Sequence, residues 1–193
     1  MLQLIMRVES ALESDIPAIL ALYRANHISN LTPAQAHHSG YIILDYPEWL
    51  LRAMMSLEPL LVAKDGTTLA GYLYPLPDYY RYIFPAFQER FDLMDGLTHQ
   101  GKKLSEHRFM KVGQVVIREE YKGKGVFKLL VEEMRRRYSV QFELIVTRIL
   151  SANPRSLAGH KKLGFQLLAE SKEVKDGKPI WSWHYIAWTT PHL

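Results

Sequence analysis

The sequence predicts an α/β fold, built as a single domain over residues 1–193. Short β-branched runs alternate along the chain with segments whose apolar residues recur every three or four positions, which indicates strands followed by amphipathic helices. In the middle of the chain the apolar period changes from that of a strand to that of a helix across two glycines. The length suits one domain with a substantial core.

The first quarter of the chain predicts a strand and three helix starts. Residues 3–8 are predicted as a short strand, and Ser14 precedes a helix with a proline in its first turn. Thr32-Pro33 indicates a second capped start, and Asp45–Pro47 opens a helix that runs to Ser56.

Two adjacent histidines, His37 and His38, are expected in a loop between the second and third helix starts. Neighbouring side chains point apart on a helix or strand, and no third ligand is spaced to join them, so we expect no metal site.

A hairpin comes next. Residues 60–63 and 69–74 should pair as the second and third strands, because Asp65-Gly66 permits the positive dihedral angles of a tight turn. Two prolines after residue 74 are expected to end the pairing. Residues 78–108 are rich in aromatic side chains, of which Phe84, Phe87 and Phe91 fit one helical face.

The central unit joins a strand to a helix. Val112 and Val115–Ile117 suit a buried strand, and the apolar residues of 126–138 form one face of a helix. Between them lies Lys122-Gly123-Lys124-Gly125. Such glycines allow a tight turn and a close backbone approach, and the helix start behind them adds unpaired N–H donors and partial positive charge. This turn predicts a phosphate-binding site; the alternative is a plain glycine turn with solvated lysines.

The last third predicts a fifth strand over residues 144–150, a short helix over 154–163, and a terminal hairpin of 165–168 and 180–188 around Asp176-Gly177. The final strand carries large side chains on both faces. Burial on both sides, in part at a contact with a second copy in a homodimer, accounts for this pattern.

Composition excludes several classes of function. The chain has no cysteine, which removes disulfides, thiolate metal sites and a cysteine nucleophile. The net charge of +4 comes from dispersed residues, so we expect no nucleic-acid partner. No apolar run is long enough to span a membrane, and no secretion signal is evident, so we expect a cytoplasmic protein.

Two motifs together resemble the signatures of the GCN5-related N-acetyltransferases, which move an acyl group from coenzyme A to an amine. The first signature, Arg or Gln followed by x-x-Gly-x-Gly or Ala, falls on residues 122–127, that is Lys122, Gly123, Lys124, Gly125, Val126 and Phe127. The second, an Asn followed by a small residue, a Tyr and a closing Gly-Phe, falls on Asn153, Ser156, His160, Gly164 and Phe165. Both occur in the family's order.

The resemblance implies a mixed, mostly antiparallel sheet flanked by helices, in which the fourth and fifth strands are splayed apart. Acetyl-CoA would bind between these two strands. It further implies that backbone groups of Val115, Val116 and Ile117 face the pantetheine and the acetyl carbonyl. Residues 122–127 would hold the pyrophosphate, Asn153 would bond the pantetheine arm, and Ser156 would also bind the cofactor. Residues 78–108 would shape the acceptor pocket. No metal is implied.

The expected activity is acetyl transfer to a primary amine of a small molecule or peptide. Three residues depart from the family pattern: Lys122 replaces Arg or Gln, Phe127 replaces a small residue, and His160 replaces Tyr. His160 is therefore a candidate proton donor to the leaving thiolate, since its reference pKa of about 6.5 is nearer neutral than that of Tyr, or it simply packs beside the cofactor.

The general base is left open by the sequence. Lys111 stands where histone-type members carry a Glu, and Glu106, His107, Gln114 or a water are the alternatives. A non-catalytic acyl-CoA-binding or sensing domain is the second interpretation. A dinucleotide fold is disfavoured, because Gly-x-Gly-x-x-Gly would need a glycine at Lys128.

Overall fold

The computed structural model describes residues 6–175 and 178–189. The chain folds into two compact units, which alternate along the sequence. The first unit comprises residues 1–75 and 113–136, and the second comprises residues 76–112 and 137–193. The single N-acetyltransferase domain over 1–193 stays a prediction.

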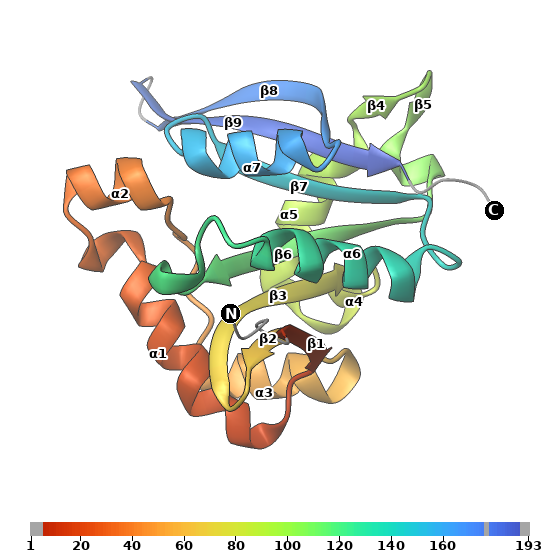
Figure 1. Ribbon diagram of the computed structural model, residues 1–193. Helices are drawn as coiled ribbons and strands as arrows, with labels where there is room; N and C mark the ends of the chain where they lie inside the picture. The colour runs from red at the N-terminus through yellow and green to blue at the C-terminus, as the bar shows by residue number, and fades with distance from the viewer. Residues whose placement is uncertain (1–5, 176–177, 190–193) are drawn as a thin grey trace. The chain divides into compact units, whose positions relative to one another are not determined.

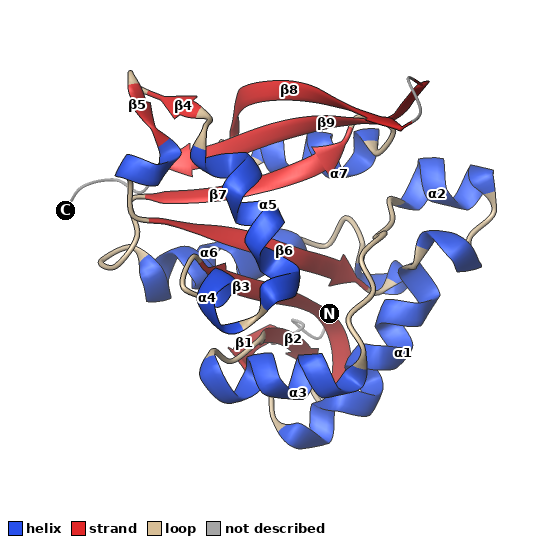
Figure 2. Ribbon diagram, turned by 180° about the vertical axis from the view of Figure 1, so that it is seen from behind, coloured by secondary structure: helices blue, strands red, loops and turns tan. Residues whose placement is uncertain are grey.

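In the part of it that the structure describes, the first unit contains the N-terminal strands and four α-helices. β1 pairs antiparallel with β2, and β2 pairs antiparallel with β3. Figure 2 shows α3 on one face of these strands, and Figure 1 shows α6 on the other. The element bounds are β1 Met6–Ser10, α1 Ile16–Asn26, α2 Pro33–Ser39, α3 Glu48–Leu57, β2 Leu61–Asp65, β3 Thr68–Pro77 and α6 Val126–Tyr138, with the short 3-10 helices η1 Glu13–Asp15, η2 Ile28–Asn30 and η4 Glu119–Tyr121.

The second unit is built on three strands in which β9 pairs antiparallel with both β7 and β8. Figure 1 shows α7 in front of these strands, and Figure 2 shows α5 crossing the opposite face. The element bounds are α4 Tyr80–Ile83, α5 Pro85–Asp95, β4 Thr98–His99, β5 Lys102–Lys103, η3 Leu104–Glu106, β7 Leu144–Leu150, α7 Pro154–Lys162, β8 Gln166–Lys175 and β9 Lys178–Thr189.

Strand β6, Phe109–Ile117, belongs to both units, and it completes a seven-stranded sheet of order β1-β2-β3-β6-β7-β9-β8. Its residues 109–111 pair in parallel with residues 144–146 of β7, and its later residues belong to the first unit. β6 and β7 are the predicted fourth and fifth strands. The predicted mixed, mostly antiparallel sheet flanked by helices is confirmed.

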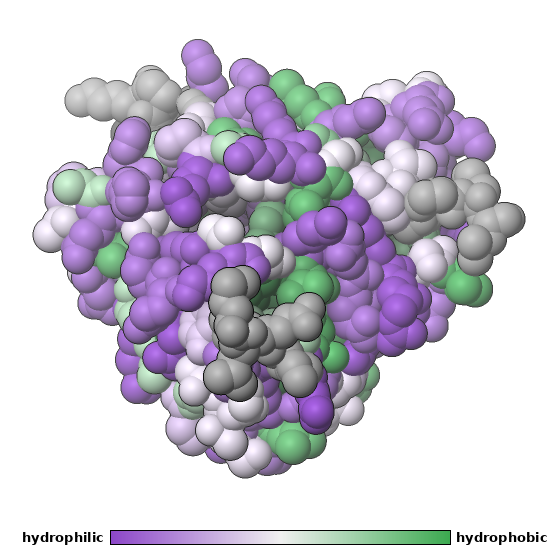
Figure 3. Space-filling model, viewed as in Figure 1, coloured by the Kyte–Doolittle hydropathy of each residue, from purple (hydrophilic) through white to green (hydrophobic). Residues whose placement is uncertain are grey.

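The predicted helix α6 and its apolar face are confirmed. Val126, Leu130 and Met134 are buried, as the spacing predicts. The outer side of the helix carries exposed charged side chains, and hydrophilic residues cover most of the face drawn in Figure 3. None of the helices in residues 6–175 is long and apolar enough to cross a bilayer.

Local differences from the sequence prediction have physical reasons. His37 and His38 form the last turn of α2 rather than a loop, because Thr32 and Gln35 make a capping box that starts a helix ahead of them. β3 runs on to Pro77, but its pairing with β2 ends at Leu73, before the two prolines, as predicted. The two-residue strands β4 and β5 form a separate ribbon that the polar sequence did not predict. The expected turn at 176–177 lies outside the described residues.

Gly71 of β3 allows β3 and β6 to approach closely within the first unit. A Cβ built at Gly71 would lie 2.8 Å from the backbone oxygen of Val116 and 2.7 Å from Cδ1 of Ile117. The N–H of Arg118 also donates to the backbone oxygen of Ala70 at 2.9 Å. Only a residue without a side chain fits this position without a shift of the β6 backbone.

We therefore expect Gly71→Ala to lower the free energy of unfolding by about 1–3 kcal/mol, the usual cost of overpacking. Urea denaturation followed by circular dichroism measures this change. Gly96→Ala is the matched control, because a Cβ there meets nothing within 4 Å and the backbone φ is −77°. An equal effect of both substitutions would contradict the close approach.

Candidate functional site

The predicted phosphate-binding site is an open turn at the start of α6. Gly123 and Gly125 adopt φ of 77° and 85°, which only glycine tolerates readily. A Cβ at either position would meet nothing within 4 Å, so the space over both residues is open. Bonding within the helix begins with the Leu129 N–H and the Gly125 oxygen at 3.0 Å, and the amides before it have no partner inside the helix. The backbone here fits an anionic group.

The two lysines of this turn differ in what they contact. Lys122 Nζ lies 2.7 Å from Glu119 Oε2, and the hydroxyl of Ser39 donates to the same oxygen at 3.2 Å. Lys124 is exposed and its Nζ lies 5.5 Å from the centre of the Tyr121 ring. Lys124 therefore offers a cation to a ligand directly, whereas Lys122 must first leave an acidic neighbour.

The end of β6 alternates in burial. Val116 is 4% exposed, whereas Val115 and Ile117 are half-buried, so the last two point to the opposite face from Val116. Phe127, which replaces a small residue of the motif, is half-buried in the first turn of α6. A ligand role for these residues stays a prediction.

In the second unit Asn153 caps helix α7. Its Oδ1 accepts from the backbone N–H of Ser156 at 3.3 Å, and Pro154 takes the first helical position. Asn153 is 5% exposed. The residue therefore has a structural reason for its place, and its predicted contact with a pantetheine arm is an additional role that stays a prediction.

His160 belongs to the C-terminal cap of the same helix. Gly164 has φ of 85°, its N–H donates to the Lys161 oxygen at 3.0 Å, and the Phe165 N–H donates to the His160 oxygen at 3.2 Å. This pair of bonds is a Schellman motif, in which the residue after the glycine contacts the third residue from the helix end. The His160 and Phe165 rings make that contact, edge to face with centroids 5.1 Å apart.

Burial sets the protonation state of His160. The side chain is 3% exposed, and this burial lowers its pKa to about 4. Nδ1 lies 2.8 Å from the backbone oxygen of Ser156, which can only accept, so Nδ1 carries the proton. The imidazole is neutral near pH 7. These contacts favour the packing role over that of an imidazolium donor, although the catalytic role itself stays a prediction.

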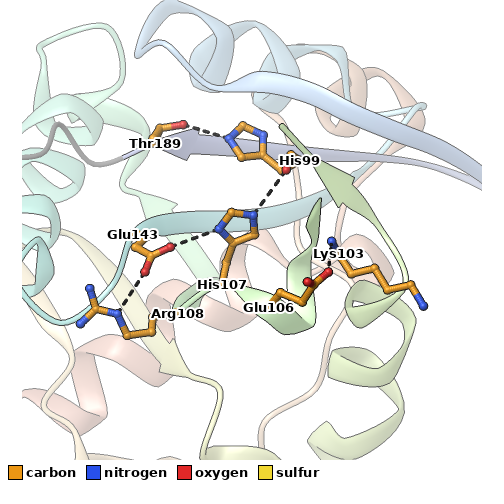
Figure 4. Close-up of polar contacts among 7 residues, drawn as sticks. All are labelled: His99, Lys103, Glu106, His107, Arg108, Glu143 and Thr189. Atoms are coloured by element: carbon orange, nitrogen blue, oxygen red, sulfur yellow. Dashed lines mark hydrogen bonds and ion pairs between the residues drawn. The ribbon is translucent and has the colours of Figure 1, made fainter. Parts of the chain in front are cut away.

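The candidate general bases are each held by other groups. Glu106 accepts from the backbone N–H of Lys103 at 2.8 Å. Both nitrogens of His107 face acceptors, Nδ1 at 3.1 Å from Glu143 and Nε2 at 3.4 Å from the backbone oxygen of His99 (Figure 4). Gln114, in the first unit, cannot titrate and donates to the backbone oxygen of Leu44 at 2.8 Å.

The ion pair around Glu143 was not predicted from the sequence. Its carboxylate takes both His107 and Arg108 as partners, which lowers the pKa of Glu143, while burial lowers the pKa of His99. His99 Nε2 in turn lies 3.2 Å from Thr189 Oγ1 (Figure 4). These contacts join the β4–β5 ribbon to β9 and to the starts of β6 and β7. A separation of 36 residues between His107 and Glu143 leaves no local sequence signal for the pair.

The structure brings the predicted residues together in two groups. Residues 122–127 form one turn of the first unit, and Asn153, Ser156 and His160 lie on one helix of the second. Within 6–175 and 178–189, no cluster of three or more His, Asp or Glu side chains could hold a metal.

Comparison with solved structures shows that the fold is that of the GCN5-related N-acetyltransferases. A GCN5-related N-acetyltransferase from Kribbella flavida superposes with a TM-score of 0.62 at 16% identity, over 95% of this chain and 97% of that one. A phosphinothricin acetyltransferase of the GNAT superfamily from Sinorhizobium meliloti, solved with acetyl-CoA, gives 0.63 at 20%, over 96% and 88%. The ribosomal-protein-S18-alanine N-acetyltransferase from Escherichia coli gives 0.61 at 11%, over 98% and 96%. No protein-family model and no curated protein matches the sequence.

The buried state of His160 predicts a pH dependence of stability. The folded pKa of about 4 is below the reference value of about 6.5, so the unfolded chain binds a proton first as the pH falls. The contribution of neutral His160 should therefore be complete above pH 6.5 and should fall by roughly 3 kcal/mol between pH 6.5 and pH 4. Denaturant unfolding of the native chain and of His160→Phe over this range measures it.

The His160→Phe variant should lack this part of the pH dependence, because Phe has no proton to take up. Proton NMR of the folded native chain provides a direct check on the ring. An imidazole that titrates near 6.5 would contradict the buried neutral form.

Proposed function

We propose that this chain, whose fold is that of the GCN5-related N-acetyltransferases, moves an acetyl group from acetyl-CoA to a primary amine of a small molecule or peptide. The observation that carries the proposal is the open turn at Gly123 and Gly125. It presents backbone donors at a helix start in the segment where the sequence resembles the family's pyrophosphate motif.

Several features of the turn support its fit to an anionic co-substrate. Gly123 and Gly125 adopt positive φ angles and carry no side chains, so the backbone of the turn stays accessible. Lys124 adds an exposed cation. Lys122 can also contribute once a phosphate competes with Glu119 for its ammonium group. One of the superposed enzymes was solved with acetyl-CoA, which gives the fold a precedent for this ligand.

The proposed reaction forms a C–N bond and breaks the C–S bond of the thioester. The acceptor amine must lose a proton, and the sulfur must gain one. Backbone groups of 115–117 are the proposed dipoles for the acetyl carbonyl. Since Glu106 and His107 are engaged and Gln114 cannot titrate, we propose that water carries the amine proton away.

A non-catalytic acyl-CoA-binding domain is the second candidate. It is favoured by the neutral, packed state of His160 and by the engagement of the candidate bases. Turnover separates the two: an enzyme releases the free thiol of coenzyme A in the presence of an amine, whereas a binding domain retains acetyl-CoA unchanged.

If acetyl-CoA binds at the glycine turn, Gly125→Val should abolish acetyl-CoA binding. Valine at φ of 85° is strained, and its side chain would occupy the open space over the turn. Titration calorimetry with acetyl-CoA measures the loss. Gly66→Val is the control, because Gly66 also has a positive φ of 58° and open space, but lies in the β2–β3 hairpin turn. Unchanged affinity in a folded Gly125→Val variant would refute the site.

The rate of thiol release in a His160→Phe variant distinguishes the two roles that His160 could have. If His160 only packs, His160→Phe keeps the native rate of thiol release. If it donates the proton to the thiolate, the rate falls by about 10² or more at unchanged acetyl-CoA affinity. A panel of primary amines assayed with a thiol-reactive dye supplies the measurement.

The buried neutral ring leads us to expect the first outcome, provided that a pre-steady-state measurement shows the chemical step to be rate-limiting. A large loss of rate with unchanged acetyl-CoA affinity would contradict the packing role. It would then restore the proton-donor role for His160.

A further inference from the structure

Three basic side chains of the second unit belong to the layer between α5 and the start of the β6–β7 pair. The Phe91 ring of α5 and the Phe109 ring of β6 lie 6.0 Å apart, so this face of β6 is covered by α5 (Figure 2). Lys111 follows two residues after Phe109 and shares its face. Lys111 pairs with Val146 of β7, so Arg148, two residues further along β7, lies on the same face.

Helix α5 supplies the third cation. Arg90 lies one turn after the buried Phe87, and its guanidinium carbon is 5.9 Å from the centre of that ring. Its Nη1 is buried and makes no hydrogen bond within the described part of the chain. The acids Asp92 and Asp95 of the same helix are engaged by Arg81 of α4.

Lys111 is the most buried of the three, at 2% exposed, and it makes no hydrogen bond or ion pair with any residue in 6–175 or 178–189. Burial lowers its pKa far below the ordinary value, and Arg148 and Arg90 lower it further. The charges that act on Lys111 are therefore both positive.

A buried cation without a counter-charge is unfavourable, and it must either lose its proton or gain an anion. Lys111 can lose its proton, but an arginine cannot. The buried Nη1 of Arg90 thus calls for an acceptor that the described chain does not provide. A planar guanidinium beside an ammonium group suits a carboxylate or phosphate, whose oxygens accept from both.

We propose that Lys111, Arg90 and Arg148 form a binding site for an oxyanion, a carboxylate or a phosphate group. Lys111 is buried and Arg90 and Arg148 are half-buried, so Lys111 is the least accessible of the three and the two arginines are partly open to solvent. On the proposed function, on which this last step rests, the oxyanion is part of the acceptor. The acceptor is then an amine that also carries a carboxylate or phosphate.

An NMR titration of the full-length chain with succinate and, separately, with inorganic phosphate tests the site. The lysine side-chain signal of Lys111 is identified by its absence in Lys111→Met. We expect at least one of the two anions to raise the apparent pKa of Lys111 by about one unit or more, as a close opposite charge does. The stronger anion identifies the carboxylate or the phosphate.

Two variants test whether the anion binds at Lys111 and Arg90. Arg90→Met should weaken the anion at Lys111 by about tenfold or more, the effect of one lost charge-assisted hydrogen bond. Lys102→Met, which removes an exposed lysine of the β4–β5 ribbon, should leave the anion affinity unchanged. No shift of Lys111 with either anion, or an equal effect of Arg90→Met and Lys102→Met, would overturn the site.

Kinetics with paired acceptors test the substrate class. The pair consists of an amino acid and the amine formed by its decarboxylation, or of a phosphorylated amine and its parent. We expect Arg90→Met to raise KM for the member that carries the carboxylate or phosphate by about tenfold or more. The member without that group and acetyl-CoA should keep their native KM values.

A native enzyme that prefers the member without the carboxylate or phosphate would overturn this substrate class. The absence of turnover with every amine, together with no binding of acetyl-CoA, would refute the proposed function. It would leave the anion titration at Lys111 decisive for the site by itself.

Discussion

The close approach of β3 and β6 at Gly71 is the constraint on which the first unit depends. With a backbone oxygen only 2.8 Å from the place of a Cβ, β3 holds the end of β6 in one position. η4 and the glycine turn follow directly from that end, so the strand contact fixes where the turn begins. Tyr121, whose hydroxyl donates to Asp65 at 2.9 Å, ties the turn back to β2. The glycine turn thus starts from a strand end that is tied to both β3 and β2.

The elements that could be predicted from the sequence are those with a strong local pattern. The strand over 144–150 and the helix over 126–138 have the predicted bounds. A run of β-branched residues indicates a buried strand, and apolar residues spaced three or four apart indicate the buried face of a helix. The cap of α2 can be predicted from Thr32-Pro33, but the length of the helix cannot, so the sequence predicts a loop at His37 and His38. The β4–β5 ribbon has two residues in each strand, which is too short for any period.

The candidate site was predictable only where it is local. The glycines of the turn and the cap at Asn153 each have a signal within a few residues of sequence. The electrostatic environment has no such signal, because it depends on contacts between distant segments. From the sequence, Lys111 is only a lysine in the place of an acid, whereas its burial within β6 follows from the pairing of β6 with β7, two strands that are separated by a helix. The engagement of His107 by Glu143 is of the same kind.

His160 and Lys111 are both buried bases with a lowered pKa, yet they differ in the contacts that surround them. The neutral imidazole donates Nδ1–H to the Ser156 oxygen, and its ring completes the contact that the Schellman motif requires with Phe165. Neutral His160 is therefore a stable end state. A neutral Lys111 would still leave the buried Nη1 of Arg90 without an acceptor in the described part of the chain, since a guanidinium keeps its charge. Hydrogen bonding and ring packing account for the buried histidine, whereas the proposed oxyanion would supply the acceptor that Arg90 Nη1 lacks in the described part of the chain.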